Sequence, residues 1–214
     1  MGTDEHRSGR EFWEDRYAAT SLSWSGNPNP VLVTEATGLT PGGAIDIGSG
    51  EGADAVWRAQ QGWQVAGVDI ATNALDKARA HAESFDPVAA ARIDWQQHGV
   101  TTWAPEPRSF DLVSVQFMHL SRPIIATMFR SLAAAVATGG TLLIVGHDAS
   151  DADESSHHRA HLAELMYSAD EVLDVITDEM LRIEIAEPRP RQVTSAEGVE
   201  IVHDVVVKVS RTIV

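Results

Sequence analysis

The residues best suited to chemistry form a glycine-rich stretch at positions 46–52, Asp-Ile-Gly-Ser-Gly-Glu-Gly. It begins at the end of a short apolar run, Ala44–Ile47, and leads into a helical pattern that starts at Ala53. Glycine can adopt positive φ angles and lets a ligand approach the backbone closely. The first turn of a helix adds unpaired N–H groups that can hold such a ligand. The sequence therefore predicts a ligand-binding loop between a strand and a helix.

A second acidic side chain, Asp69, ends the next apolar run, Gln64–Val68. In a β-α-β unit, a carboxylate at the end of the second strand can accept hydrogen bonds from both hydroxyls of a ribose. The glycine loop and Asp69 together predict a cofactor that carries a nucleoside.

Two classes of cofactor fit this pattern. Gly48, Gly50 and Ala53 match the G-x-G-x-x-G/A pattern of dinucleotide sites, which leaves an NAD(P)-dependent oxidoreductase as an alternative. Asp46 favours S-adenosylmethionine, because a carboxylate beside a pyrophosphate is repulsive whereas one beside an ammonium is favourable. A third glycine at Gly52 is also typical of loops that bind S-adenosylmethionine. The residues therefore favour the methyl donor over a dinucleotide.

Several segments along nearly the whole chain carry a family resemblance: Trp13 with Arg16-Tyr17, Trp24 with Asn27–Pro30, Asp46–Gly52, Trp63–Asp69, Phe110–Val113, Gln116–Leu120 and Gly139–Leu143. Through them the chain resembles the class I S-adenosylmethionine-dependent methyltransferases, in the small-molecule group that includes the thiopurine and tellurite-resistance types. The resemblance implies methyl transfer from S-adenosyl-L-methionine to a small-molecule acceptor by in-line displacement. A non-catalytic protein that only binds S-adenosylmethionine remains an alternative.

The resemblance also implies which residues contact the cofactor. They are Asp46, Gly48, Ser49, Gly50, Gly52, Gln116 and Phe117 at the methionine end, Asp69 at the ribose, Ile70, His98, Gly99 and Val100 at the adenine, and Arg16 and Trp24 from the lead segment. Family members often place an aspartate after the third strand to accept from the adenine amino group. This chain departs from that pattern, because the corresponding stretch at 98–100 holds no acid.

Two histidines are candidates for catalysis because each follows an apolar run. His119 lies just beyond Phe110–Gln116, and His147 follows Thr141–Gly146. The carboxyl ends of central strands are where ligands bind in open α/β sheets. A neutral imidazole there could deprotonate a hydroxyl, an amine or a thiol of the acceptor. The alternative is that both rings are structural.

Two further groups have a structural and a functional interpretation. The aromatic residues of the lead segment, Trp13, Tyr17 and Trp24, either pack the segment onto the sheet or cap the cofactor with a cation–π contact to the sulfonium. The polar stretch 148–161 contains several acids and histidines. It is typical of a solvated loop or a mobile lid, and no metal site is predicted there.

These residues need a parallel sheet wrapped by helices. Apolar runs predict strands at Ala44–Ile47, Gln64–Asp69, Arg92–Gln96, Phe110–Gln116, Thr141–Gly146, Leu181–Ala186 and Val202–Ser210. Periodic segments predict helices at Glu11–Tyr17, Val31–Thr37, Ala53–Gln61, Thr72–Glu83, Pro123–Ala137 and Ser168–Ile176, with Thr72 as an N-cap and Gly139-Gly140 as a helix stop. The fold class predicted is α/β, a single domain with a Rossmann-like, doubly wound, seven-stranded, mostly parallel sheet. Its last strand is expected to be antiparallel, with residues 1–40 as an N-terminal helical cap on a core of residues 41–214.

Composition excludes several classes of protein. There is no cysteine, which excludes disulfides, thiolate metal sites and cysteine nucleophiles and is consistent with a reducing compartment. The formal charge is −15, with only two lysines, Lys77 and Lys208, so binding to nucleic acid or to anionic membranes is not expected. The polar start lacks an apolar signal segment, and a cytoplasmic monomer or homodimer is the expectation.

Overall fold

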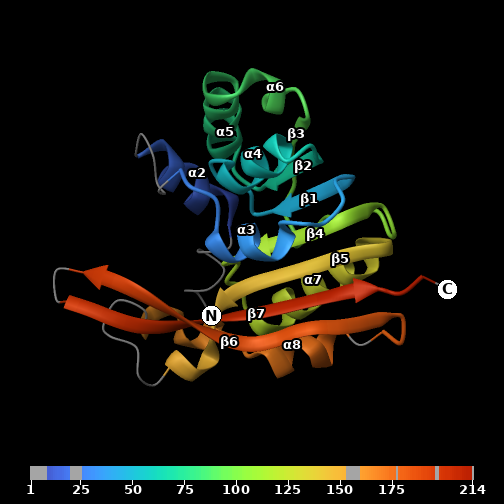
Figure 1. The fold of residues 1–214 in the computed structure, drawn as a ribbon. Coiled ribbons are helices and arrows are strands. Elements are labelled where there is room, and N and C mark those ends of the chain that lie inside the picture. Colours follow the sequence, from blue (N-terminus) through green and yellow to red (C-terminus); the bar gives the residue numbers. More distant parts are fainter. Residues whose placement is uncertain (1–8, 20–25, 153–159, 177, 196–197, 214) are drawn as a thin grey trace.

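A computed structural model describes residues 9–19, 26–152, 160–176, 178–195 and 198–213. Seven strands form one sheet in the order β3-β2-β1-β4-β5-β7-β6 (Figure 1). Their bounds are β1 Gly43–Ile47, β2 Gln64–Asp69, β3 Ile93–Gln97, β4 Phe110–Gln116, β5 Val136–His147, β6 Leu181–Ser195 and β7 Gly198–Arg211. Strands β1 to β5 pair in parallel, while β7 is antiparallel to both β5 and β6. The predicted mostly parallel sheet with an antiparallel last strand is confirmed.

Helices cover both faces of this sheet. They are α2 Arg10–Ala18, α3 Pro30–Ala36, α4 Ala53–Gln60, α5 Thr72–Phe85, α6 Pro87–Ala90, α7 Arg122–Ala135 and α8 Ala169–Val175, with short 3-10 turns at Ala149–Asp151 and Ala160–Leu165. One core contains Leu32 of α3 and Ala55 of α4, and the opposite core contains Phe129 of α7 and Val172 of α8. The sheet is therefore doubly wound, as predicted.

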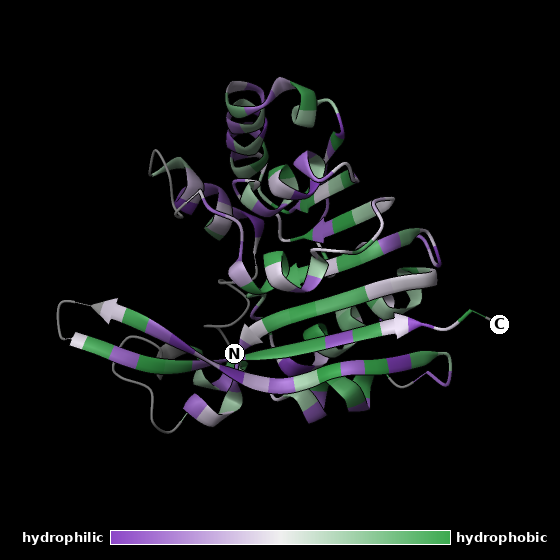
Figure 2. Ribbon diagram, viewed as in Figure 1, coloured by the Kyte–Doolittle hydropathy of each residue, from purple (hydrophilic) through white to green (hydrophobic). Residues whose placement is uncertain are grey.

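The central strands are apolar because both of their faces are covered (Figure 2). Leu112, Val113 and Val115 of β4 are fully buried, and so are four consecutive residues of β5, Leu142–Val145. The strand order reverses between β1 and β4, and the crevice outside the carboxyl ends at such a switch point is where ligands bind. The loops after β1, β4 and β5 are therefore where a ligand site is expected.

The structure corrects the expected role of Gly139-Gly140. Helix α7 ends at Ala135, and the glycines lie inside β5 rather than at a helix stop. Gly139 has a φ of +79°, and a side chain on Gly140 would place its Cβ 2.9 Å from the carbonyl oxygen of Phe110. The register between β4 and β5 shifts at this point. Glycine is required for close approach of two strands at an irregularity, not to end the helix.

A second correction concerns the start of α5, where Thr72 was expected to act as the N-cap. Ala71 occupies that position, and the helix is capped from outside by Glu14 of α2. The Glu14 carboxylate accepts from the backbone N–H groups of Thr72 at 2.8 Å and Asn73 at 2.9 Å. Burial opposes ionisation, but these two N–H groups and Arg10 hold the pKa of Glu14 below its ordinary value. The lead helix is thereby attached to the helix that follows Asp69.

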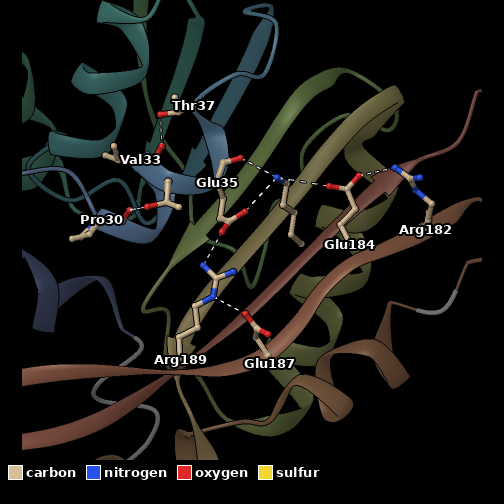
Figure 3. A network of polar contacts seen from close by, with 10 residues as sticks. Pro30, Val33, Glu35, Thr37, Arg182, Glu184, Glu187 and Arg189 are labelled. Atoms are coloured by element: carbon tan, nitrogen blue, oxygen red, sulfur yellow. Dashed lines mark hydrogen bonds and ion pairs between the residues drawn. The ribbon is translucent and has the colours of Figure 1, made fainter.

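The antiparallel pair β6–β7 is longer than predicted. It includes Pro188 and Pro190, which are tolerated because β6 is an edge strand, where a missing N–H can face away from the partner. The residues of this pair that lie beyond the end of β5 extend away from the sheet (Figure 1). Glu35 of α3 joins the pair to the helical layer, because it binds Arg189 at 2.7 Å and Lys208 at 3.4 Å (Figure 3).

In the described part of the chain, no helix is both long and apolar enough to cross a membrane.

Candidate functional site

The glycine loop has the positive φ angles that its glycines allow. Gly48, Gly50 and Gly52 have φ angles of +70°, +54° and +84°, all in the left-handed region. The N–H groups of Gly48 and Ser49 donate to the carbonyl of Val68 at 2.8 and 2.9 Å, which holds the loop against β2. The loop, predicted from residues 46–52, is therefore attached to the strand that carries Asp69.

Asp69 lies beside this loop, as predicted. Its Oδ2 accepts from the Gly50 N–H at 2.9 Å, and its Oδ1 accepts from the Ala71 N–H at 2.9 Å. Burial raises the pKa of Asp69, and these N–H groups partly offset the effect. A carboxylate has about four acceptor sites. Asp69 therefore keeps acceptor capacity for a diol without giving up its backbone contacts.

Asp46 forms an ion pair with Arg58, a fully buried residue of α4 that the sequence analysis did not identify. The Arg58 guanidinium lies 3.1 Å from Asp46 Oδ1 and also bonds the Ser114 hydroxyl of β4, which itself lies 3.4 Å from the carboxylate. Asp46 Oδ2 is buried and has no hydrogen-bond partner among the residues described. One signal was available, because Asp54 and Arg58 stand four apart on one face of α4.

Asp54 connects the same group to the lead segment. Its carboxylate accepts from the Asn29 N–H at 2.6 Å, one residue before α3 begins. Burial raises the pKa of Asp54 to about 6, and the charge of Asp46 adds to the effect, while Arg58 and the Asn29 N–H oppose it. Two acids thus share one buried arginine under the glycine loop.

The residues predicted for the adenine lie together in part. Ile70 Cδ1 lies 3.2 Å from where a Cβ on Gly99 would stand, so an alanine there would crowd the isoleucine. The Ile70 carbonyl accepts from Gln97 Nε2 at 3.0 Å. The His98 ring is instead stacked on Trp103, with centroids 4.4 Å apart and planes 3° from parallel. Ile70 and Gly99 can form an apolar wall there, whereas the His98 face is covered by tryptophan.

The end of β4 faces the glycine loop. Met118 Cε lies 2.6 Å from the position a Cβ on Gly48 would take. Phe117 has a φ of +51°, an uncommon value for a bulky residue that marks a strained turn at the switch point. Both polar atoms of the Gln116 side-chain amide are buried without a hydrogen-bond partner in the described ranges. The turn after β4 therefore packs against the glycine loop through Met118, and the contact of Gln116 and Phe117 with the cofactor stays a prediction.

The two candidate catalytic histidines stack on each other. Their ring centroids are 4.6 Å apart with planes at 20°, and Phe117 packs on the His147 ring at 4.9 Å. His147 Nδ1 lies 3.6 Å from Oδ1 of Asp204, a β7 residue that Arg191 of β6 binds at 2.6 and 3.1 Å. Sequence reading missed both Asp204 and Arg191, although a charge directly before the run of valines at 205–207 was a signal.

The remaining predictions concern the lead segment and the loop after β5. Tyr17 is buried against Ala71 and Ala74, which confirms packing for this residue. The Arg16 guanidinium lies 5.8 Å from the centre of the Trp13 ring. Trp24 and positions 153–159 of the predicted lid lie outside the described residues. Among those described, no group of three acids or histidines could hold a metal ion.

Comparison with known proteins places this geometry in context. Residues 44–140 match the family model described as "Methyltransferase domain". No curated protein matches the sequence. Solved structures do match, at identities that establish likeness of fold. One comes from work on the conversion of a disulfide bond into a thioacetal group during echinomycin biosynthesis, with 22% identity, a TM-score of 0.70, and coverage of 95% of this chain and 93% of that one.

Two further structures show the same likeness. TehB from Haemophilus influenzae is 14% identical, with a TM-score of 0.68 over 95% of this chain and 67% of its own. Magnesium protoporphyrin IX methyltransferase from Synechocystis, solved with bound S-adenosylhomocysteine, is 14% identical, with a TM-score of 0.66 over 98% of both chains. The likeness thus extends well beyond the segment that the family model matches.

Proposed function

We propose that this protein transfers the methyl group of S-adenosylmethionine to a small-molecule acceptor, because residues 44–140 match the model of a methyltransferase domain and the chain shares its fold with solved methyltransferases. The observation that carries the proposal is the joining of the two cofactor motifs by one hydrogen bond, from Gly50 N–H to Asp69. This bond places a glycine loop suited to the methionine end beside a carboxylate suited to the ribose.

The polar atoms around the loop fit the methionine end of this cofactor. Asp46 Oδ2, Ser49 Oγ and both amide atoms of Gln116 are buried without hydrogen-bond partners in the described part of the chain. Each such atom costs free energy until a partner arrives. The cofactor carries an ammonium, which would suit the Asp46 carboxylate and the Gln116 carbonyl oxygen, and a carboxylate, which would suit the Gln116 amide N–H and the Ser49 hydroxyl. A dinucleotide would bring phosphate charge toward Asp46 instead.

The chemistry proposed is an in-line displacement, for which the cofactor supplies an activated methyl group on sulfur. The protein's part is to align the acceptor and to exclude water, and alignment of this kind can lower a barrier by roughly 7–11 kcal/mol. His119 and His147 at the carboxyl ends of β4 and β5 take the acceptor's proton. Catalysis then divides between a cofactor side at β1 and β2 and an acceptor side at β4, β5 and β7.

Two observations support a small acceptor. Structures with the same fold include geranyl diphosphate methyltransferase and magnesium protoporphyrin IX methyltransferase, whose names specify small substrates. The charge of −15 opposes binding to nucleic acid. We place the protein in the cytoplasm, because its cysteine-free composition suits a reducing compartment.

Titration calorimetry tests the cofactor assignment. S-adenosylmethionine and S-adenosylhomocysteine should both bind with micromolar affinity, and NAD and NADP should give no comparable heat. Asp46→Asn should weaken both sulfur ligands, because the ammonium loses its counter-charge. Tight binding of NAD with no response to either sulfur ligand would overturn the proposal and favour an oxidoreductase.

A further inference from the structure

We infer that Asp204, clamped by Arg191, is a positioning residue that orients His147 and stabilises one positive charge on the His119–His147 pair. The acceptor would then arrive with its proton still attached, as an alcohol, phenol, thiol or amine. This inference rests on the proposed function, because it assigns a role to the acceptor side of the same site.

Strand pairing sets the position of Asp204. In the antiparallel pair β5–β7, His147 stands directly opposite Asp204, so the two side chains project from the same face of the sheet. Asp204 is 2% exposed and is followed by the buried valines 205–207. A carboxylate in such a setting is costly unless it is paired. A buried Asp204 therefore needs partners, and it has two, Arg191 and His147.

Arg191 is the first partner and fixes the orientation of the carboxylate. Its Nε lies 2.6 Å from Oδ2 and its terminal nitrogen 3.1 Å from Oδ1, the two-pronged contact that planar guanidinium makes best. The same guanidinium lies 5.8 Å from the centre of the Phe117 ring, which packs on His147. Asp204 therefore cannot rotate away from the imidazole without breaking the clamp.

His147 is the second partner. Its Nδ1 lies 3.6 Å from Oδ1, which is ion-pair distance and slightly longer than a hydrogen bond. Burial acts against ionisation of Asp204, but His147 and Arg191 outweigh it and lower the pKa of the carboxyl, which keeps Asp204 negative near neutral pH. A negative charge at Nδ1 favours the tautomer with its proton on Nδ1 and leaves Nε2 as the basic nitrogen.

The stacked rings make the pair a unit. Two imidazolium ions with centroids 4.6 Å apart repel each other, so the pair takes up one proton readily and a second one reluctantly. Asp204 faces the pair from β7, and Arg191 acts on the pair through its contact with Asp204. During transfer the acceptor's O–H, S–H or N–H bond breaks and its proton moves to the histidine pair. The acceptor atom forms a bond to the methyl carbon as the carbon–sulfur bond of S-adenosylmethionine breaks, and the sulfur keeps that electron pair as the neutral thioether of S-adenosylhomocysteine.

The decisive experiment is an NMR titration of the imidazole nitrogens in protein saturated with S-adenosylhomocysteine. Asp204→Asn should lower the apparent pKa of the pair by about one unit, since a neutral amide cannot stabilise the imidazolium. Arg191→Gln should shift it the opposite way, because the carboxylate charge is no longer partly neutralised. If Asp204 and Arg191 were merely structural, the two variants would not shift the apparent pKa of the pair in opposite directions.

The chain offers a matched control in a second histidine–aspartate pair, His203 with Asp151 at 2.8 Å. Asp151→Asn should move the titration of His203 and leave the His119–His147 pair unchanged. Once an acceptor is in hand, the acidic limb of kcat/KM should move with the NMR value in each variant.

The outcomes separate the two proposals. Unchanged titration of the pair in Arg191→Gln, and in Asp204→Asn if that variant folds, would overturn the inference even if S-adenosylhomocysteine binds normally. Failure of both sulfur ligands to bind the wild-type protein would instead overturn the proposed function.

Discussion

Two buried carboxylates are each bound by an arginine, and the two pairs differ in how deeply the arginine is buried. Under the glycine loop, the Arg58 side chain is 0% exposed and that of Asp46 is 3% exposed. At the acceptor side, Asp204 is as buried as Asp46, but Arg191 is 38% exposed. Water can therefore replace Arg191 in part, whereas nothing can replace Arg58.

The difference matches the work that each side must do. On the cofactor side, the proposed contact with the ammonium requires a rigid support, so that Asp46 Oδ2, which has no hydrogen-bond partner among the described residues, stays available. On the acceptor side, the proposed histidine pair gains and loses a proton, so the charges around it have to adjust. A half-exposed clamp allows that response, since charge near water can be adjusted at lower cost than charge in the core.

Removal of His119 should have the largest effect and should act on the acceptor side alone. His119→Ala should lower kcat by about 10²–10⁴-fold, the usual contribution of general base catalysis. Affinity for S-adenosylhomocysteine, measured by calorimetry, should stay the same, because the ring would face the acceptor. His81→Ala is a suitable control, since His81 stacks on Phe85 in α5. Loss of cofactor binding or of folding would assign His119 to packing.

Removal of Arg58 should have the largest effect on stability. Arg58→Met leaves Asp46 as a buried charge with one weak partner, Ser114, so the free energy of unfolding should fall by about 3–5 kcal/mol. Arg191→Met should cost only about 1–2 kcal/mol, because water and His147 can compensate for the loss. Urea denaturation measures both. Asp46→Asn placed in the Arg58→Met background should recover part of the loss, and equal costs for the two arginine variants would contradict the contrast.

Asp69 binds the glycine loop, and if it also binds the ribose as proposed, its loss should weaken cofactor binding more than stability. Hydrogen bonds to a charged acceptor contribute roughly 1.5–3 kcal/mol each before competition from water. Asp69→Ala should therefore weaken S-adenosylhomocysteine binding by about tenfold or more in calorimetry. Asp76→Ala, an exposed change on α5, should leave the affinity as it is. Unchanged affinity in folded Asp69→Ala protein would mean that the carboxylate serves the loop alone.

Asp54 should make stability depend on pH on the cofactor side. Its folded-state pKa is raised to about 6 from an ordinary value of 3.8, so the folded state binds the proton more tightly than the unfolded state. The free energy of unfolding should fall as pH rises from about 4 to 6. Asp54→Asn keeps an acceptor for the Asn29 N–H and should remove this fall, giving a gain of about 3 kcal/mol above pH 6. Identical pH profiles from urea denaturation would contradict the assignment.

Local patterns accounted for much of the fold and for the glycine loop. The bounds of β2 and β4 agree with those predicted from their apolar runs, because strand periodicity is a property of adjacent residues. Predictions at Gly139-Gly140 and Thr72 were wrong for one reason. In each case a contact with a residue far along the chain decides the local structure. Gly140 packs against the Phe110 carbonyl, and the Thr72 N–H donates to the Glu14 carboxylate.

What the sequence alone determined is the cofactor side. A strand, three glycines with positive φ and a helix start lie within one short stretch, and Asp69 follows at the end of the next strand. Only the tertiary structure decided the acceptor side. The approach of Asp204 to His147 depends on the antiparallel register of β7 against β5, and Arg191 reaches Asp204 only through the pairing of β6 with β7. Register between distant strands is set by packing of the whole sheet, which no local pattern specifies.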